Sequence, residues 1–225
     1  MRDEDYEKVR QLSIFKNTSE EVFHQLTSAS FLQRFPAGVV LLQEKTMADF
    51  LYILIDGKVE MFSHTYGHEM TLGVIEPVQF FILAAVLTNK VCLQSARTMS
   101  AAQLLMIPAN LINAKVREDP TFATAVIHEL ANNYRSMVKE LKDQKALSST
   151  ERLANWIIRQ SQTSGTPHYV DITYEKKILA SYLGMTAENL SRAFSKLTQH
   201  GIKVDGSRII ITDREKIMNF FTIAS

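Results

Sequence analysis

Residues 176–195 read KKILASYLGMTAENLSRAFS, and this stretch decides how the C-terminal third of the chain folds. Ala180 is small at a point where two helices must approach closely, and Gly184 can adopt the positive φ of a sharp turn four residues later. Thr186 can cap a second helix, and Leu190 can anchor that helix on the first. The spacing predicts a helix-turn-helix. An ordinary pair of antiparallel helices is the alternative.

Residues 201–211, GIKVDGSRIII, follow the second helix and predict a two-stranded wing. Together with the slightly basic balance of residues 148–225, which hold 10 basic and 7 acidic side chains, the wing favours a DNA-binding module. An arginine can bind guanine O6 and N7 in a bidentate manner, and a carboxylate can accept from cytosine N4. We expect Glu188 and Arg192 to read bases and Lys196 and Arg208 to contact phosphates. The full set of DNA-binding candidates is Thr186, Glu188, Asn189, Ser191, Arg192, Lys196 and Arg208.

Residues 120–147 form the longest helical candidate, and their apolar positions mostly recur at threes and fours. A narrow apolar seam of this kind suits a two-stranded coiled coil, and a polar Asn within it can fix the register of a dimer. The alternative is an amphipathic helix that packs on its own domain. The expected homodimer interface consists of Phe122, Val126, Leu130, Asn133, Met137 and Leu141.

The N-terminal half changes texture at Phe31. Residues 1–30 predict short helices, with an N-cap within Thr18-Ser19-Glu20-Glu21. Short apolar segments separated by turn residues then predict a β-sandwich or barrel. The strands are expected at residues 39–42, 50–55, 59–62, 70–75, 91–96 and 103–107. We therefore divide the chain into a β-domain (1–119), a dimerisation helix (120–147) and a helix-turn-helix domain (148–225).

Composition excludes several classes of protein. The single cysteine among 225 residues, Cys92, rules out an internal disulfide framework, a Cys-based zinc site and an iron–sulfur cluster. The longest apolar run, residues 80–87, is far shorter than the roughly 20 residues that span a bilayer, and the charged N-terminus does not resemble a secretory signal. No HExxH motif, Gly-rich phosphate loop or Ser/His/Asp pattern indicates an enzyme. These features predict a cytoplasmic, non-enzymatic protein without a membrane segment.

With these parts in this order, the chain resembles the family of the cyclic AMP receptor protein and the fumarate–nitrate reductase regulator. The resemblance covers essentially the whole sequence, and residues 50–59 (FLYILIDGKV) and 179–192 (LASYLGMTAENLSR) carry it. It implies an α+β fold, with an N-terminal double-stranded β-helix (a cupin-like β-roll) as sensor domain and a C-terminal winged helix-turn-helix.

The resemblance also implies a function, that of a homodimeric transcription regulator that binds double-stranded DNA and contacts RNA polymerase if it is an activator. The pattern from Glu188 to Ser191-Arg192 accompanies TTGAT- or TTGAC-type half-sites among relatives. Ala187 stands where the cyclic AMP receptor protein carries Arg, which weakens the case for the different half-site of that protein.

Three departures argue against a cyclic nucleotide as effector. Relatives hold the ribose with a Gly-Glu-Leu turn and the phosphate with an Arg-Ser pair, and these positions fall on Phe81-Ile82-Leu83 and Cys92-Leu93. The Thr-Ser pair that touches adenine in the cyclic AMP receptor protein falls on Met137-Val138. Apolar side chains cannot supply the cation and donors that a buried phosphate needs. We therefore expect neither cyclic AMP nor an iron–sulfur cluster.

The apolar side chains at these positions suggest an apolar effector pocket. In this respect the chain resembles regulators that respond to nitric oxide, some of which bind haem. Haem b is one hypothesis, beside an apolar organic effector or no effector. Each candidate iron ligand has a plainer interpretation, as a solvated histidine or a core cysteine. The sequence leaves the effector, the regulated genes and the choice between activation and repression open. The pocket candidates are Phe80, Phe81, Ile82, Leu83, Val86, Leu87, Cys92, Met137 and Val138, and the ligand candidates are His64, His68, Cys92 and His128.

Overall fold

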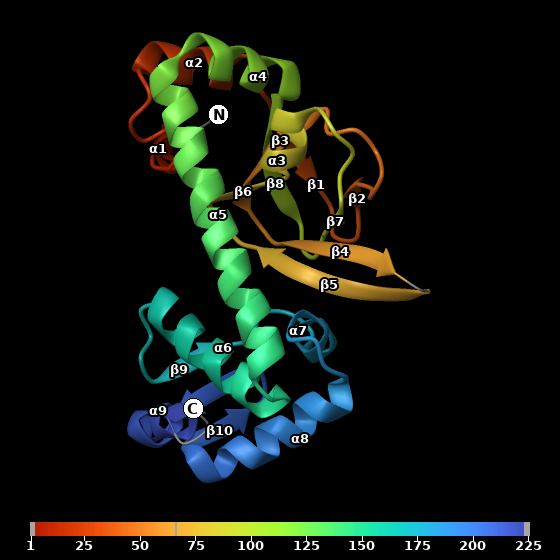
Figure 1. The fold of residues 1–225 in the computed structure, drawn as a ribbon, viewed down its shortest axis with the longest axis vertical. Coiled ribbons are helices and arrows are strands. Elements are labelled where there is room, and N and C mark those ends of the chain that lie inside the picture. The colour runs from red at the N-terminus through yellow and green to blue at the C-terminus, as the bar shows by residue number, and fades with distance from the viewer. Residues whose placement is uncertain (1–2, 66, 223–225) are drawn as a thin grey trace. The chain divides into compact units, whose positions relative to one another are not determined.

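The computed structural model describes residues 3–65 and 67–222, and it confirms the expected fold class (Figure 1). A β-roll, a long helix and a winged helix-turn-helix follow one another along the chain. Two compact units, residues 1–136 and 137–225, meet within the long helix α5 (Pro120–Ala146). No helix of the described residues is long and apolar enough to cross a membrane.

Two four-stranded antiparallel sheets build the β-roll of the N-terminal unit. Alternate side chains of the central strand β3 serve two cores, because successive residues of a strand point to opposite faces. Leu51 and Ile53 pack with the N-terminal helices, whereas Tyr52 and Leu54 pack between the sheets. One sheet has the order β1 (Phe31–Phe35), β8 (Ala102–Pro108), β3 (Phe50–Asp56), β6 (Gln79–Phe81), and the other β2 (Val40–Leu42), β7 (Ser95–Thr98), β4 (Val59–Thr65), β5 (His68–Ile75).

Four helices complete this unit together with the beginning of α5. They are α1 (Asp3–Arg10), α2 (Glu20–Ser28), α3 (Leu83–Thr88) and α4 (Ala109–Glu118). Ser19 caps α2 as expected, since its Oγ accepts from the backbone N–H of Val22 at 3.3 Å. Figure 1 shows α1, α2 and α4 gathered around the start of α5. Phe122 of α5 stacks on Phe15 with ring centroids 6.2 Å apart, so the first turns of α5 belong to this core.

The turn between β3 and β4 requires glycine. Gly57 has a φ of +91°, and a Cβ built on it would lie 2.4 Å from the carbonyl oxygen of Ala101. Any side chain would therefore clash with the backbone beside the turn, in addition to the strain of the positive φ. Strand β3 accordingly ends at Asp56, directly before this glycine.

One expectation about the second half of the β-roll is corrected. The strand expected at residues 91–96 begins only at Ser95, because Val91 forms an isolated bridge with Met47 and Leu93 is 83% exposed. The apolar run 80–87 is not one element, since Ile82 adopts a left-handed φ of +61° between β6 and α3. Strands β4 and β5 are longer than the segments 59–62 and 70–75 expected for them, and Tyr66 in the connection between them lies outside the described residues.

The C-terminal unit packs its helices and a small sheet around one apolar core that includes Leu153, Trp156 and Leu179. The sheet has the strand order β10–β11–β9, so the wing pairs with the short strand that precedes the helix-turn-helix. The elements are α6 (Ser149–Thr163), β9 (Tyr169–Asp171), α7 (Lys176–Tyr182), α8 (Ala187–Leu197), a 3-10 turn (Thr198–His200), β10 (Ile202–Asp205), β11 (Arg208–Ile211) and α9 (Arg214–Thr222).

Candidate DNA-binding surface and effector domain

The helix-turn-helix forms as the sequence predicts. Helix α7 ends before Gly184, whose φ of +63° makes the turn, and Thr186 caps α8 by accepting from the backbone N–H of Asn189 at 3.1 Å. Sequence reasoning missed Arg152, which reaches from α6 and donates to the carbonyl of Leu183 at 2.9 Å. The turn is therefore held from outside as well as by its own residues.

Helix α8 buries one face and presents the other. Leu190 and Phe194 are buried in the core of the unit, whereas Glu188 and Arg192 are 78% and 67% exposed. The guanidinium of Arg192 donates to Oδ1 of Asn189 at 2.7 Å and lies 3.4 Å from the Glu188 carboxylate. Asn189 and Glu188 therefore restrict the position of the Arg192 side chain in the absence of a ligand. Ser191 and Lys196, the other candidates on this helix, are also exposed.

Arg208 of the wing, which we expected to contact phosphate, is paired within its own unit. It donates to both carboxylate oxygens of Asp171, at 2.6 and 2.9 Å, and its guanidinium lies 4.3 Å from the centre of the Tyr169 ring. Hydrogen bonds from Arg208 hold the pKa of Asp171 below its usual value. A phosphate would have to compete with this carboxylate, because the fork is already occupied.

The expected effector pocket is divided between two cores. Phe81, Ile82 and Cys92 pack between the two sheets, where Phe81 stacks on Tyr52 with ring centroids 5.2 Å apart. The other β-roll candidates pack with the N-terminal helices instead: Phe80, Leu83, Val86 and Leu87. The two candidates on α5, Met137 and Val138, are exposed and half-buried, respectively.

The candidate iron ligands do not assemble into a haem site. His64, His68 and His128 are exposed, and burial raises the pKa of the Cys92 thiol, which disfavours the thiolate that binds metals. The described residues contain no group of three His, Cys, Asp or Glu side chains that could hold a metal. With the apolar candidates divided between two packed clusters, the residues present do not fit haem.

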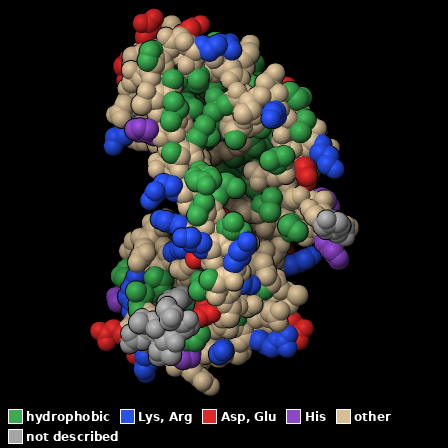
Figure 2. All heavy atoms as spheres, in the orientation of Figure 1, with side chains coloured by type: hydrophobic (Ala, Val, Ile, Leu, Met, Phe, Trp, Pro, Cys, Tyr) green, Lys and Arg blue, Asp and Glu red, His purple; other side chains and the backbone are tan. Residues whose placement is uncertain are grey.

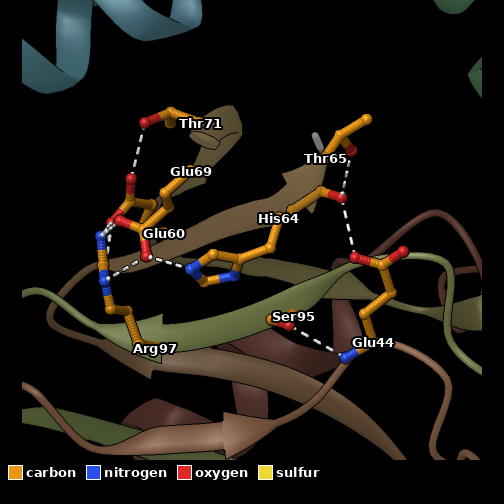
Figure 3. Close-up of polar contacts among 9 residues, drawn as sticks. Glu44, Glu60, His64, Thr65, Glu69, Thr71, Ser95 and Arg97 are labelled. Carbon is orange, nitrogen blue, oxygen red and sulfur yellow. Dashed lines mark hydrogen bonds and ion pairs between the residues drawn. The ribbon is translucent and has the colours of Figure 1, made fainter. Parts of the chain in front are cut away.

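His64 belongs instead to a polar cluster on the outer face of the β2–β7–β4–β5 sheet (Figure 3). The buried carboxylate of Glu60 accepts from Thr71 at 2.6 Å and from Nε of Arg97 at 2.8 Å. Arg97 also donates to Glu69 at 2.6 Å, and Glu69 lies 3.2 Å from Nε2 of His64. The cluster joins the hairpin strands β4 and β5 to the more distant strand β7, and the contact of Arg97 with Glu60 across 37 residues has no local signal in the sequence.

The seam expected on α5 is partly wrong. Phe122 and Val126 are fully or almost fully buried in the N-terminal core, so they are not available to a second chain. Asn133 is exposed but lies beside the apolar stripe that the helix presents. That stripe, which we call the α5 stripe, has alternating steps of three and four residues and consists of Ile127, Leu130, Tyr134, Met137 and Leu141.

The α5 stripe is largely exposed. Its side chains are between 52% and 70% exposed except for Leu130, which is half-buried. Figure 2 shows hydrophobic side chains at the surface along the middle of the course of α5. The sequence already contains these steps of three and four. It does not show that Phe122 is buried in the N-terminal core, so it could not show that the exposed stripe begins only at Ile127.

Comparisons with known proteins find one known domain in each unit. Residues 32–119 match the cyclic nucleotide-binding domain and residues 151–220 match the Crp-like helix-turn-helix domain. The CRP-like cAMP-activated global transcriptional regulator of Mycobacterium tuberculosis is 23% identical over 212 residues, which cover 91% of this chain and 94% of that protein.

Solved structures show the same fold. FixK2 from Bradyrhizobium japonicum is similar with a TM-score of 0.75 and 16% identity, over 84% of this chain and 96% of that one. DNR from Pseudomonas aeruginosa is similar with a TM-score of 0.54 and 21% identity, over 98% of this chain and 99% of that one.

Proposed function

The chain belongs to the CRP/FNR family of transcription regulators, and from this premise we propose that it binds palindromic DNA with TTGAT- or TTGAC-type half-sites as a homodimer. The exposed face of α8 carries the proposal, because Arg192 and Glu188 are 67% and 78% exposed on it and Asn189 restrains the arginine. An arginine fork matches guanine and a carboxylate matches cytosine. Such a protein acts in the cytoplasm, where the DNA lies, and contacts RNA polymerase if it activates.

The homodimer is supported by the α5 stripe. Exposed apolar side chains at steps of three and four are the pattern that a second copy of the same helix covers in a coiled coil. In a dimer, two recognition helices about 34 Å apart enter successive major grooves, which is why the proposed target is a palindrome.

Binding assays on two duplexes test the half-site. The wild-type chain should prefer a TTGAT palindrome over a scrambled duplex, and Arg192→Ala should cost roughly 1–3 kcal/mol per half-site on the palindrome only. Lys196→Ala is the comparison, because loss of an exposed phosphate contact should weaken binding to both duplexes alike and lower the salt slope by about 0.9 per protomer, or about 1.8 in the dimer. Equal losses on both duplexes for Arg192→Ala would leave the half-site without support.

The effector we propose is an apolar organic molecule rather than a nucleotide. A buried thiol, Cys92, and an apolar side chain, Leu93, stand at the positions where relatives hold the phosphate. Four aromatic rings instead follow one another on the inner face of the β-roll, from the half-exposed Phe31 through Phe50 and Tyr52 to Phe81, with centroids 5.2–6.3 Å apart. These rings offer apolar faces and no cation or hydrogen-bond donor set for a phosphate.

Cyclic AMP is the decisive compound to test, because it activates the Mycobacterium relative by that protein's description. Calorimetric titration should show no binding of cyclic AMP or cyclic GMP at micromolar concentration, and either nucleotide binding there would contradict the proposal. After incubation with stoichiometric haem and removal of the unbound haem, the protein should show no Soret band, and a band that stays with the protein would return haem to consideration.

A further inference from the structure

A groove of about 380 Å³ runs between the recognition helix and the wing, and we call it the helix–wing groove. Its volume lies in the range of small-ligand cavities. One wall is the flank of α8 that carries Ser191 and Ser195, and the opposite wall is β10 with Lys203 and Val204. Lys176, the first residue of α7, lies at the same groove. Nothing in the sequence links these residues, which come from three separate segments.

The charge of the groove is positive and uncompensated. Its lining contains two lysines and no carboxylate. Among the residues that the structure describes, neither Lys176 nor Lys203 forms an ion pair, although Lys216 in the same unit pairs with Asp213 at 3.5 Å and Arg208 pairs with Asp171. Two cations without a counter-charge beside a groove fit an anionic ligand.

The position of the groove decides which anion it takes. A recognition helix that enters the major groove lies between two sugar–phosphate backbones, so the flank of the helix faces one of them. The hydroxyls of Ser195 and Thr198 already donate to carbonyls of α8, at 3.1 and 3.2 Å. The donors that remain for an anion include the charged amino groups of the two lysines.

We propose that the helix–wing groove receives a backbone phosphate beside the half-site, held by Lys176 on one side and Lys203 on the other. The proposal rests on DNA binding through α8 but not on the identity of the half-site. It adds one phosphate contact per protomer to those of the recognition helix, supplied by α7 and β10. It also makes the wing strand β10, rather than Arg208 on β11, the main basic contact of the wing.

The salt dependence of binding to a scrambled duplex tests the groove without any assumption about sequence. Since both lysines of a protomer hold one phosphate, Lys176→Gln and Lys203→Gln should each remove about half of that contact from each protomer. In the dimer each variant should therefore reduce the salt slope by about 0.9 and weaken binding roughly eightfold at 0.1 M salt. The double variant loses one phosphate contact per protomer and should reduce the slope by about 1.8. Lys203→Arg keeps the charge and should retain the slope. Lys216→Gln is the matched control, since its amino group lies on α9 and is paired with Asp213. Thermal unfolding followed by the fluorescence of Trp156 checks that each variant is folded.

A series of duplexes with one neutral methylphosphonate each then locates the phosphate. At one position the neutral linkage should weaken binding of the wild-type chain but not of the double variant. The proposal is overturned if the double variant keeps the wild-type slope, or if every methylphosphonate weakens the double variant as much as the wild type. Normal DNA binding with a loss of transcription in vitro would assign the groove to a protein partner and also overturn it. Failure of the half-site alone would appear differently, as equal wild-type affinity for the TTGAT and scrambled duplexes.

Discussion

Arg192 owes its position to Asn189. The amide oxygen accepts from the guanidinium at 2.7 Å, and Glu188 lies on the other side at 3.4 Å. We predict that Asn189→Ala weakens binding to the TTGAT duplex by about 0.5–1.5 kcal/mol, the usual contribution of one hydrogen bond, with little effect on scrambled DNA. In an Arg192→Ala background the same change should have no effect. Additive losses in this double-mutant cycle would show that Asn189 contacts the DNA directly.

Asp171 restrains the wing in a comparable way. Its carboxylate occupies both donors of the Arg208 fork, so removing its charge should free the guanidinium for phosphate. We predict that Asp171→Asn tightens binding several-fold on specific and scrambled duplexes and steepens the salt slope by about 0.9 per protomer, or about 1.8 in the dimer. Glu215→Gln on α9 changes the net charge by the same amount and serves as control. An equal gain for both variants would mean that net charge, and not the release of Arg208, is responsible.

At the scale of elements, helix α6 begins with a capping box that makes its stability depend on pH. The Ser148 hydroxyl accepts from the backbone of Glu151 at 3.4 Å, and the Glu151 carboxylate accepts from the backbone of Ser148 at 2.6 Å. These hydrogen bonds with Ser148 lower the pKa of Glu151. The ionised Glu151 carboxylate therefore stabilises the fold fully at pH values above the ordinary glutamate pKa of about 4.3. This stabilisation is lost as the pH falls through the lowered pKa of Glu151.

We accordingly predict two changes in urea unfolding followed by Trp156, the single tryptophan, which lies in the core of this unit. Ser148→Ala should reduce the free energy of unfolding by about 1 kcal/mol at neutral pH. Glu151→Gln should remove the part of the acid destabilisation that belongs to this carboxylate. An unchanged pH profile in Glu151→Gln would show that other acids control it.

The sequence predicted the elements whose signals are local. Gly184 and Thr186 define the helix-turn-helix within three residues, and the wing follows from its own turn. The seam of α5 could not be predicted, because the partner of Phe122 is Phe15, more than a hundred residues away, and an apolar residue reads alike in a core and in an interface. The single effector pocket could not be predicted correctly for the same reason, because the sequence does not show which of two cores an apolar side chain enters.

The whole molecule should exist as a dimer. Light scattering of the wild-type chain should give about twice 25.5 kDa, and Met137→Glu should give the monomer mass, because a charge would be buried in the centre of the α5 stripe. Asn132→Glu is the control, since residue 132 lies on the opposite side of the helix. Leu130 is a poorer choice for substitution because it also packs against the N-terminal core. A dimer that survives Met137→Glu would exclude this interface.

The stacking of Phe122 on Phe15 also sets the angular phase of everything that follows on α5. Each helical residue adds about 100° of rotation, so one residue inserted after Asn132 would turn Tyr134, Met137 and Leu141 away from Ile127. Seven inserted residues would bring them back to within about 20°. Chimaeric proteins that splice another sensor onto this helix should therefore dimerise when the count of residues from the aromatic anchor is conserved or differs by a heptad.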